Sequence, residues 1–105
     1  MGPMISKPPF DPASPEEAHR GVVLRGRVQG VGFRWWTREI AGQLGLRGTV
    51  RNLPDGSVEI HVAGPIAGVQ AFIDRIHTGP RHAMVASVEE IPCRAGLPER
   101  FRIAL

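Results

Sequence analysis

The sequence predicts an α+β fold in two layers, because it contains short β-branched runs, two stretches of apolar residues at helical spacing, and glycine or proline between them. Its 105 residues leave room for one domain. Hydrophobic residues make up 42% of the chain and charged residues 22%, the ordinary balance of a globular domain. No apolar run approaches the roughly 18 residues that span a bilayer, so no membrane contact is expected.

The first 18 residues differ from the rest of the chain. They contain five of the ten prolines and show no apolar periodicity, so they bury too little surface to offset the entropy of ordering. We expect a flexible proline-rich tail over residues 1–18 and one folded domain over residues 19–105. The start lacks the apolar core of a secretory signal and the single cysteine, Cys93, excludes an intramolecular disulfide, so a cytoplasmic protein is expected.

The first strand and the first helix follow from residue spacing. Residues 21–28 are rich in β-branched side chains and bounded by glycine, which predicts a strand. Over residues 33–44 apolar side chains recur every three or four positions, on one face of a predicted helix: Phe33, Trp36, Ile40, Ala41 and Leu44. Gly45 favours the left-handed conformation that ends a helix.

The second half of the chain predicts a hairpin, a helix and two strands. Residues 48–53 and 57–62 alternate with period two about a Pro-Asp-Gly turn. A second helix opens at Pro65, with apolar residues at Ile66, Val69, Phe72, Ile73 and Ile76. In residues 83–91 alternation sets Met84, Ala86 and Val88 against Val85, Ser87 and Glu89, and a short last strand alternates Phe101, Ile103 and Leu105. The order βαββαβ, with this short C-terminal strand, is that of the ferredoxin-like sandwich, in which two helices cover one face of a largely antiparallel sheet.

Three glycines crowd the turn between the first strand and the first helix, Gly26-Arg27-Val28-Gln29-Gly30-Val31-Gly32-Phe33-Arg34. Glycine permits positive φ and lets backbone NH groups converge, and a helix beginning at Phe33 adds unpaired NH groups and a positive dipole end. These features predict an anion cradle that Arg34 can close through two parallel hydrogen bonds. The alternative is a tight turn whose arginine faces water. The turn is neither a Walker A loop nor Gly-x-Gly-x-x-Gly.

Asn52, near the end of the strand that enters the hairpin, is the second candidate. An asparagine beside a turn commonly bonds nearby backbone, which is the alternative to a functional role. In the ferredoxin-like fold the first and third strands are central neighbours, so the hairpin can reach the same end of the sheet as the glycine turn. Arg34 and Asn52 could therefore face one ligand.

The net charge and the potential metal ligands do little to identify the function. From residue 20 onward twelve arginines stand against seven acidic residues, a surplus of +5 that suits anions in general or merely reflects solvated side chains. His61, His77 and His82 lack ligand spacing with acids or cysteine, and His19 lies at the border of the tail, so surface or partly packed histidines and no metal are expected. Cys93 is expected to be inert.

Two motifs together resemble the acylphosphatase family. They are Gly26-Arg27-Val28-Gln29-Gly30-Val31-Gly32-Phe33-Arg34-x-x-Thr37 and Gly45-Leu46-x-Gly48-x-Val50-x-Asn52-x-x-Asp55-Gly56-x-Val58-Glu59, and the similarity runs from about Arg20 to the end. The resemblance implies hydrolysis of the mixed anhydride of a carboxylic acid and phosphate, with no metal, no cofactor and no covalent enzyme intermediate. Its partner would be a small acyl phosphate, with no nucleic acid, and the protein would be a monomer.

By position, the resemblance implies that Arg34 binds the phosphate with the loop residues Gln29, Gly30, Val31, Gly32 and Phe33, while Asn52 orients the attacking water. Thr37 would support the loop or bond backward into its own helix. Trp35 and Trp36 depart from the pattern; Trp36 fits the buried helix face and Trp35 its margin, with packing expected rather than substrate stacking. Leu105 stands where family members often carry an aromatic residue.

Two alternatives from other functional classes remain open. A non-catalytic phosphate- or RNA-binding module would suit the fold and the charge, although Phe101 is the one strand aromatic available to stack a base. The domain could also bind an acyl or carbamoyl phosphate within a larger maturation protein. A free-standing enzyme is expected, because the sequence shows no zinc-finger cysteines.

Overall fold

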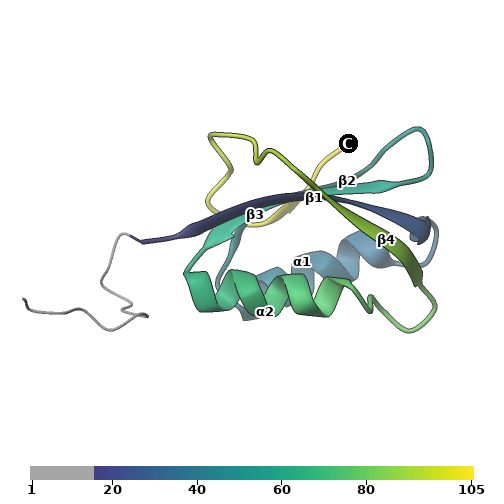
Figure 1. The fold of residues 1–105 in the computed structure, drawn as a ribbon, viewed down its shortest axis with the longest axis horizontal. Coiled ribbons are helices and arrows are strands. Elements are labelled where there is room, and N and C mark those ends of the chain that lie inside the picture. The colour runs from purple at the N-terminus through teal and green to yellow at the C-terminus, as the bar shows by residue number, and fades with distance from the viewer. Residues whose placement is uncertain (1–15) are drawn as a thin grey trace, which may run out of the picture.

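The computed structural model describes residues 16–105, in which strands and helices follow the predicted order (Figure 1). The strands are β1 (Ala18–Arg27), β2 (Arg47–Asn52), β3 (Val58–Gly64), β4 (Met84–Ile91) and β5 (Arg102–Ile103), and the helices are α1 (Phe33–Gln43) and α2 (Ile66–Ile76). Most of the expected tail, residues 1–15, lies outside the described residues. β1 begins one residue inside the expected tail, since Ala18 already pairs with Gly64 of β3.

Across residues 16–105 the strands form one sheet in the order β4-β1-β3-β2-β5. All neighbours are antiparallel except β2 and β5, which run parallel. Figure 1 shows both helices beneath the same face of this sheet. The prediction of a largely antiparallel, ferredoxin-like α+β sandwich is confirmed, including the central pairing of the first and third strands.

The core lies between the sheet and the helices. Cross-strand pairs such as Val22 with Ile60 and Leu24 with Val58 are fully buried, and α2 packs on β1 and β3 while α1 packs on β2 and β5. The apolar face predicted for α1 is confirmed, with Trp36 packed edge-on against Phe33 at 5.5 Å between ring centroids. The face predicted for α2 is confirmed except at Ile66, which lies at the margin of the first turn and is 45% exposed.

The single alternation predicted for β4 is wrong, because a β-bulge interrupts it. Arg25 pairs with Ser87 but Gly26 pairs with Val85, so Ala86 is an extra residue on β4. Val85 and Val88 consequently both pack against the core, while Met84 is exposed. The bulge depends on Gly26, since a Cβ at this position would lie 2.1 Å from the carbonyl oxygen of Met84.

The chain end follows the prediction for two residues only. Phe101 is buried against Phe72. Ile103 pairs with Val50 of β2 in the parallel ladder and packs on the core. Leu105 continues the alternation in sequence but is fully exposed. The short last strand is therefore confirmed, without a packed terminal side chain.

Candidate active site

The loop between β1 and α1 leaves the first backbone NH groups of α1 without a side-chain cap. Gly30 and Gly32 adopt left-handed conformations, with φ of 75° and 76°. Gly32 is the N-cap of α1, and neither a capping side chain nor an acidic residue in the first turn satisfies the first helical NH groups. A Cβ at either glycine would meet nothing within 4 Å, so both positions require glycine for backbone conformation rather than for space.

Arg34 lies in the first turn of α1 and is half-buried. Several other arginines are neutralised by carboxylates, in the pairs Arg20–Glu90, Arg25–Glu89, Arg47–Glu17 and Arg51–Glu59. Among the residues that the structure describes, none pairs with Arg34. A guanidinium at a helix N-terminus opposes the dipole by about 0.3–1 kcal/mol, so an anion at this position would stabilise both.

Asn52 is the last residue of β2. Its carbonyl oxygen, Oδ1, is buried, and no group of residues 16–105 donates a hydrogen bond to it. A purely structural turn asparagine would bond nearby backbone. In this turn Asp55 makes such bonds, since it accepts hydrogen bonds from the backbone NH and the hydroxyl of Ser57. The hydrogen bonds from the Ser57 hydroxyl and NH lower the pKa of Asp55, since they stabilise its ionised carboxylate.

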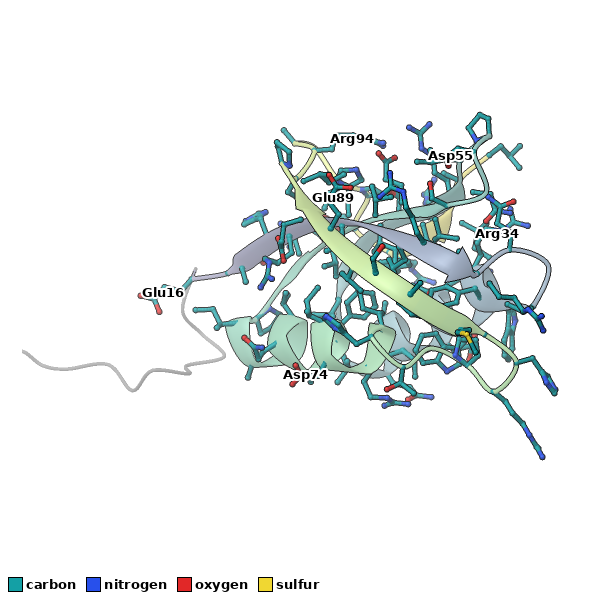
Figure 2. The ribbon with its side chains drawn as sticks, turned by 45° about the vertical axis from the view of Figure 1, so that its right-hand side comes forward. Glu16, Arg34, Asp55, Asp74, Glu89 and Arg94 are labelled. Carbon is teal, nitrogen blue, oxygen red and sulfur yellow. The ribbon has the colours of Figure 1, made fainter. Side chains whose placement is uncertain are left out.

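One cavity of about 210 Å³ joins the loop to the end of β2. It is lined by Val28, Gly30, Gly32, Phe33, Arg34, Trp35, Asn52 and Ile103. Figure 2 shows Arg34 and the hairpin residue Asp55 on the same side of the molecule. A larger depression of about 440 Å³ lies beside Trp36, but it contains neither the glycine loop nor Asn52.

Gln29 ties the loop to the hairpin. Its side-chain Nε2 donates one hydrogen bond to the Leu53 carbonyl and one to the Ser57 carbonyl, both at 2.8 Å. Both amide hydrogens are thus engaged by the segment that follows Asn52. The Gln29 side chain therefore fixes the position of the loop relative to Asn52. The loop and Asn52 are the two parts that form the cavity.

Comparison with known proteins identifies the family. A family model described as Acylphosphatase matches residues 20–103. This chain belongs to the acylphosphatase family. An acylphosphatase of Nitrobacter hamburgensis is 46% identical over 87 residues, which cover 83% of this chain and 88% of the relative.

Solved structures agree with this assignment. The acylphosphatase of Bacillus subtilis superposes with a TM-score of 0.73 at 36% identity, covering 83% of this chain and 98% of its own. An acylphosphatase from Coxiella burnetii superposes with a TM-score of 0.74 at 34% identity, covering 84% and 93%. The protein is therefore a hydrolase of the acylphosphatase family, whose substrate class is the acyl phosphates.

Some residues implied by the family pattern lie beside the cavity rather than on its wall. The Thr37 hydroxyl is fully buried and donates to the Phe33 carbonyl at 2.8 Å, the backward bond that was one of its two expected positions. Val31 is partly buried against the core. Trp35 was expected to pack at the margin of the helix face, but it is 58% exposed and lines the cavity. Its place directly after Arg34 was the signal available in the sequence.

The histidines play no part in this cavity. In the described part of the chain, no three His, Cys, Asp or Glu side chains lie close enough to hold a metal, and no helix is long and apolar enough to cross a membrane. The expectation of surface or partly packed histidines is wrong for His61, which is only 4% exposed and accepts a hydrogen bond from the Arg94 NH at 3.0 Å. Burial lowers the pKa of His61, although the nearby Glu59 carboxylate opposes the shift.

Proposed function

We propose that this acylphosphatase binds the phosphate of its substrate between the β1–α1 loop and Arg34, and that Asn52 orients the water that attacks phosphorus. One observation carries the proposal. Gly30, Gly32, Arg34 and Asn52 line a single cavity, in which the Asn52 carbonyl oxygen has no other partner among residues 16–105. Two segments far apart in sequence thus offer an anion site and an acceptor for water side by side.

The reaction needs little more than position and charge. The water oxygen bonds to phosphorus while the bond from phosphorus to the carboxylate oxygen breaks, giving a carboxylate and inorganic phosphate. A carboxylate leaves readily, so no general acid is required, and the described residues place no carboxyl or imidazole group in the cavity wall. Loop NH groups and the Arg34 fork stabilise the charge on the phosphate oxygens as the bond breaks.

Asn52 acts by orientation rather than as a base. Its amide oxygen accepts a hydrogen bond from water, but a carboxamide does not take a proton at neutral pH. The proton of the attacking water passes instead to a phosphate oxygen of the substrate. Holding the water in line with the breaking bond lowers the entropic part of the barrier.

We further propose a monomeric cytoplasmic enzyme that needs neither metal nor cofactor and does not bind nucleic acid. The fold supports the last point, because Phe101, the aromatic that could have stacked a base, is buried. Salt-dependent binding of single-stranded RNA would contradict it. Gel filtration tests the monomer, and activity in excess chelator tests independence from metal.

The deciding experiment is hydrolysis of benzoyl phosphate in excess chelator by the wild type and three alanine variants. We expect kcat to fall by about 10²-fold or more in Asn52→Ala and by about 10³-fold in Arg34→Ala. Arg38→Ala is the matched control, since Arg38 lies on the same helix, is exposed and does not line the cavity. Its kcat should stay within about twofold of wild type.

Each other result contradicts a particular step. A wild-type rate in Asn52→Ala, with its fold verified by circular dichroism, would leave Asn52 without a role in orienting water. An equal loss of kcat in Arg34→Ala and Arg38→Ala would mean that Arg34 contributes only positive charge in general and does not bind the phosphate.

A further inference from the structure

Trp35 is an exposed aromatic side chain at the wall of the cavity. Within residues 16–105 the large apolar side chains on the surface are Trp35, Ile66, Met84 and Leu105. Of these, only Trp35 lines the cavity that holds Arg34 and Asn52. Because covering apolar surface is favourable, its 58% exposed indole offers a ligand a contact beside the phosphate site.

The cavity wall has a polar part and an apolar part. Gly30, Gly32, Arg34 and Asn52 supply the polar groups. Of the four apolar residues in the wall, Val28 and Phe33 are almost fully buried, so the accessible apolar surface comes from Trp35 and Ile103. If the phosphate occupies the polar part, the rest of the substrate can extend along Trp35 and Ile103.

Among residues 16–105, Arg34 is the one charged side chain in this wall. Once it is paired with phosphate, the wall offers no partner to a second charge on the acyl group. An apolar acyl group has no such need, and an aromatic one can pack edge-on or offset against the indole. A small acyl group such as acetyl covers little of it.

We propose that Trp35, together with Ile103, forms the acyl-binding subsite and makes this enzyme prefer acyl phosphates with aromatic or bulky apolar acyl groups. The inference rests on the proposed function, because the position of the phosphate determines where the acyl group lies. Trp35 is then a specificity-determining residue that contacts the substrate without taking part in bond breaking.

The test compares benzoyl phosphate with acetyl phosphate as substrates of the wild type, Trp35→Ala, Trp35→Phe and Ile66→Ala. In Trp35→Ala the ratio of kcat/KM for benzoyl over acetyl phosphate should fall about tenfold, mostly through KM for benzoyl phosphate. Trp35→Phe should restore most of the ratio. Ile66→Ala, another exposed apolar residue but on α2 and outside the cavity, should keep the wild-type ratio.

The outcomes separate this inference from the proposed function. An unchanged benzoyl-to-acetyl ratio in Trp35→Ala overturns the subsite even when both substrates are hydrolysed rapidly. If the wild type hydrolyses neither substrate, the proposed function fails, and calorimetric binding of benzylphosphonate and methylphosphonate tests the subsite directly. A benzyl preference that disappears in Trp35→Ala supports it; equal affinities, or no binding, overturn it.

Discussion

Replacing Gln29 with leucine tests whether the loop and the hairpin must be tied together for catalysis. The change removes two hydrogen bonds, each at 2.8 Å, to the carbonyls of Leu53 and Ser57. Neither carbonyl is left without a hydrogen bond, because the Ser57 carbonyl still accepts from the Leu53 NH and the Leu53 carbonyl still accepts from the Gly56 NH. The cost is then that of two ordinary hydrogen bonds, about 2 kcal/mol in the free energy of unfolding, without a further desolvation penalty.

The effect on activity should exceed what the stability change implies. Without the tie, the phosphate loop and Asn52 no longer hold one relative position, and a misplacement of about 1 Å can cost about 10²-fold in rate. We expect kcat for benzoyl phosphate to fall between about 10- and 100-fold in Gln29→Leu, with a smaller change in KM because the loop NH groups and Arg34 remain.

Urea unfolding, followed by tryptophan fluorescence, and steady-state kinetics on the same samples measure both quantities. Gln43→Leu serves as the control, since Gln43 ends α1, is exposed and lies away from the cavity. A Gln29→Leu variant that loses about 2 kcal/mol but keeps its kcat within twofold would refute the positioning argument. If the free energy of unfolding of Gln29→Leu instead equals that of the wild type, the energetic argument is refuted.

Three further outcomes are expected. Arg34→Lys should not restore activity lost in Arg34→Ala, because lysine lacks the planar two-pronged donor, and phosphate release measures this. Burial lowers the pKa of His61, so the folded protein binds fewer protons than the unfolded chain, and its stability should fall as pH drops through the ordinary value of 6.5. Between pH 7.5 and pH 5.5 the free energy of unfolding, measured in urea, should fall less in His61→Gln than in the wild type. Deleting residues 1–15 should leave kcat and Tm unchanged, whereas deleting residues 1–20 should lower Tm, because it removes the pairing of Ala18 with β3 and the ion pair from Glu17 to Arg47.

The parts of the site that sequence could predict are those set by local spacing and topology. Glycine spacing and the apolar periodicity that begins at Phe33 placed Arg34 in the first turn of a helix, where the structure has it. The order of elements made the first and third strands neighbours, which brings the β2–β3 hairpin to the end of β1. The shared cavity of Arg34 and Asn52 follows from these two facts.

The rest depends on contacts between segments that no local pattern reveals. The bulge in β4 arises from the close approach of Gly26 to the backbone of Met84, residues that lie 58 positions apart in sequence. Gln29 shows the same limit, since its position in the loop suggested substrate contact while its side chain reaches the hairpin carbonyls. Alternation and helical spacing describe one element at a time, whereas these contacts are decided between elements.

Replacing Asn52 should separate the stability of the fold from its activity. No group of residues 16–105 donates to the Asn52 carbonyl oxygen, so Asn52→Ala breaks no hydrogen bond to it within the fold and should leave the free energy of unfolding within about 1 kcal/mol of wild type while it lowers kcat by about 10²-fold. Thr37→Val is the contrasting variant, because it removes a buried hydroxyl that already donates to Phe33 and should lower stability. A loss of more than about 1 kcal/mol in Asn52→Ala would mean that the side chain stabilises the hairpin after all. No change would indicate that the fold retains Asn52 for the chemistry in the cavity rather than for stability.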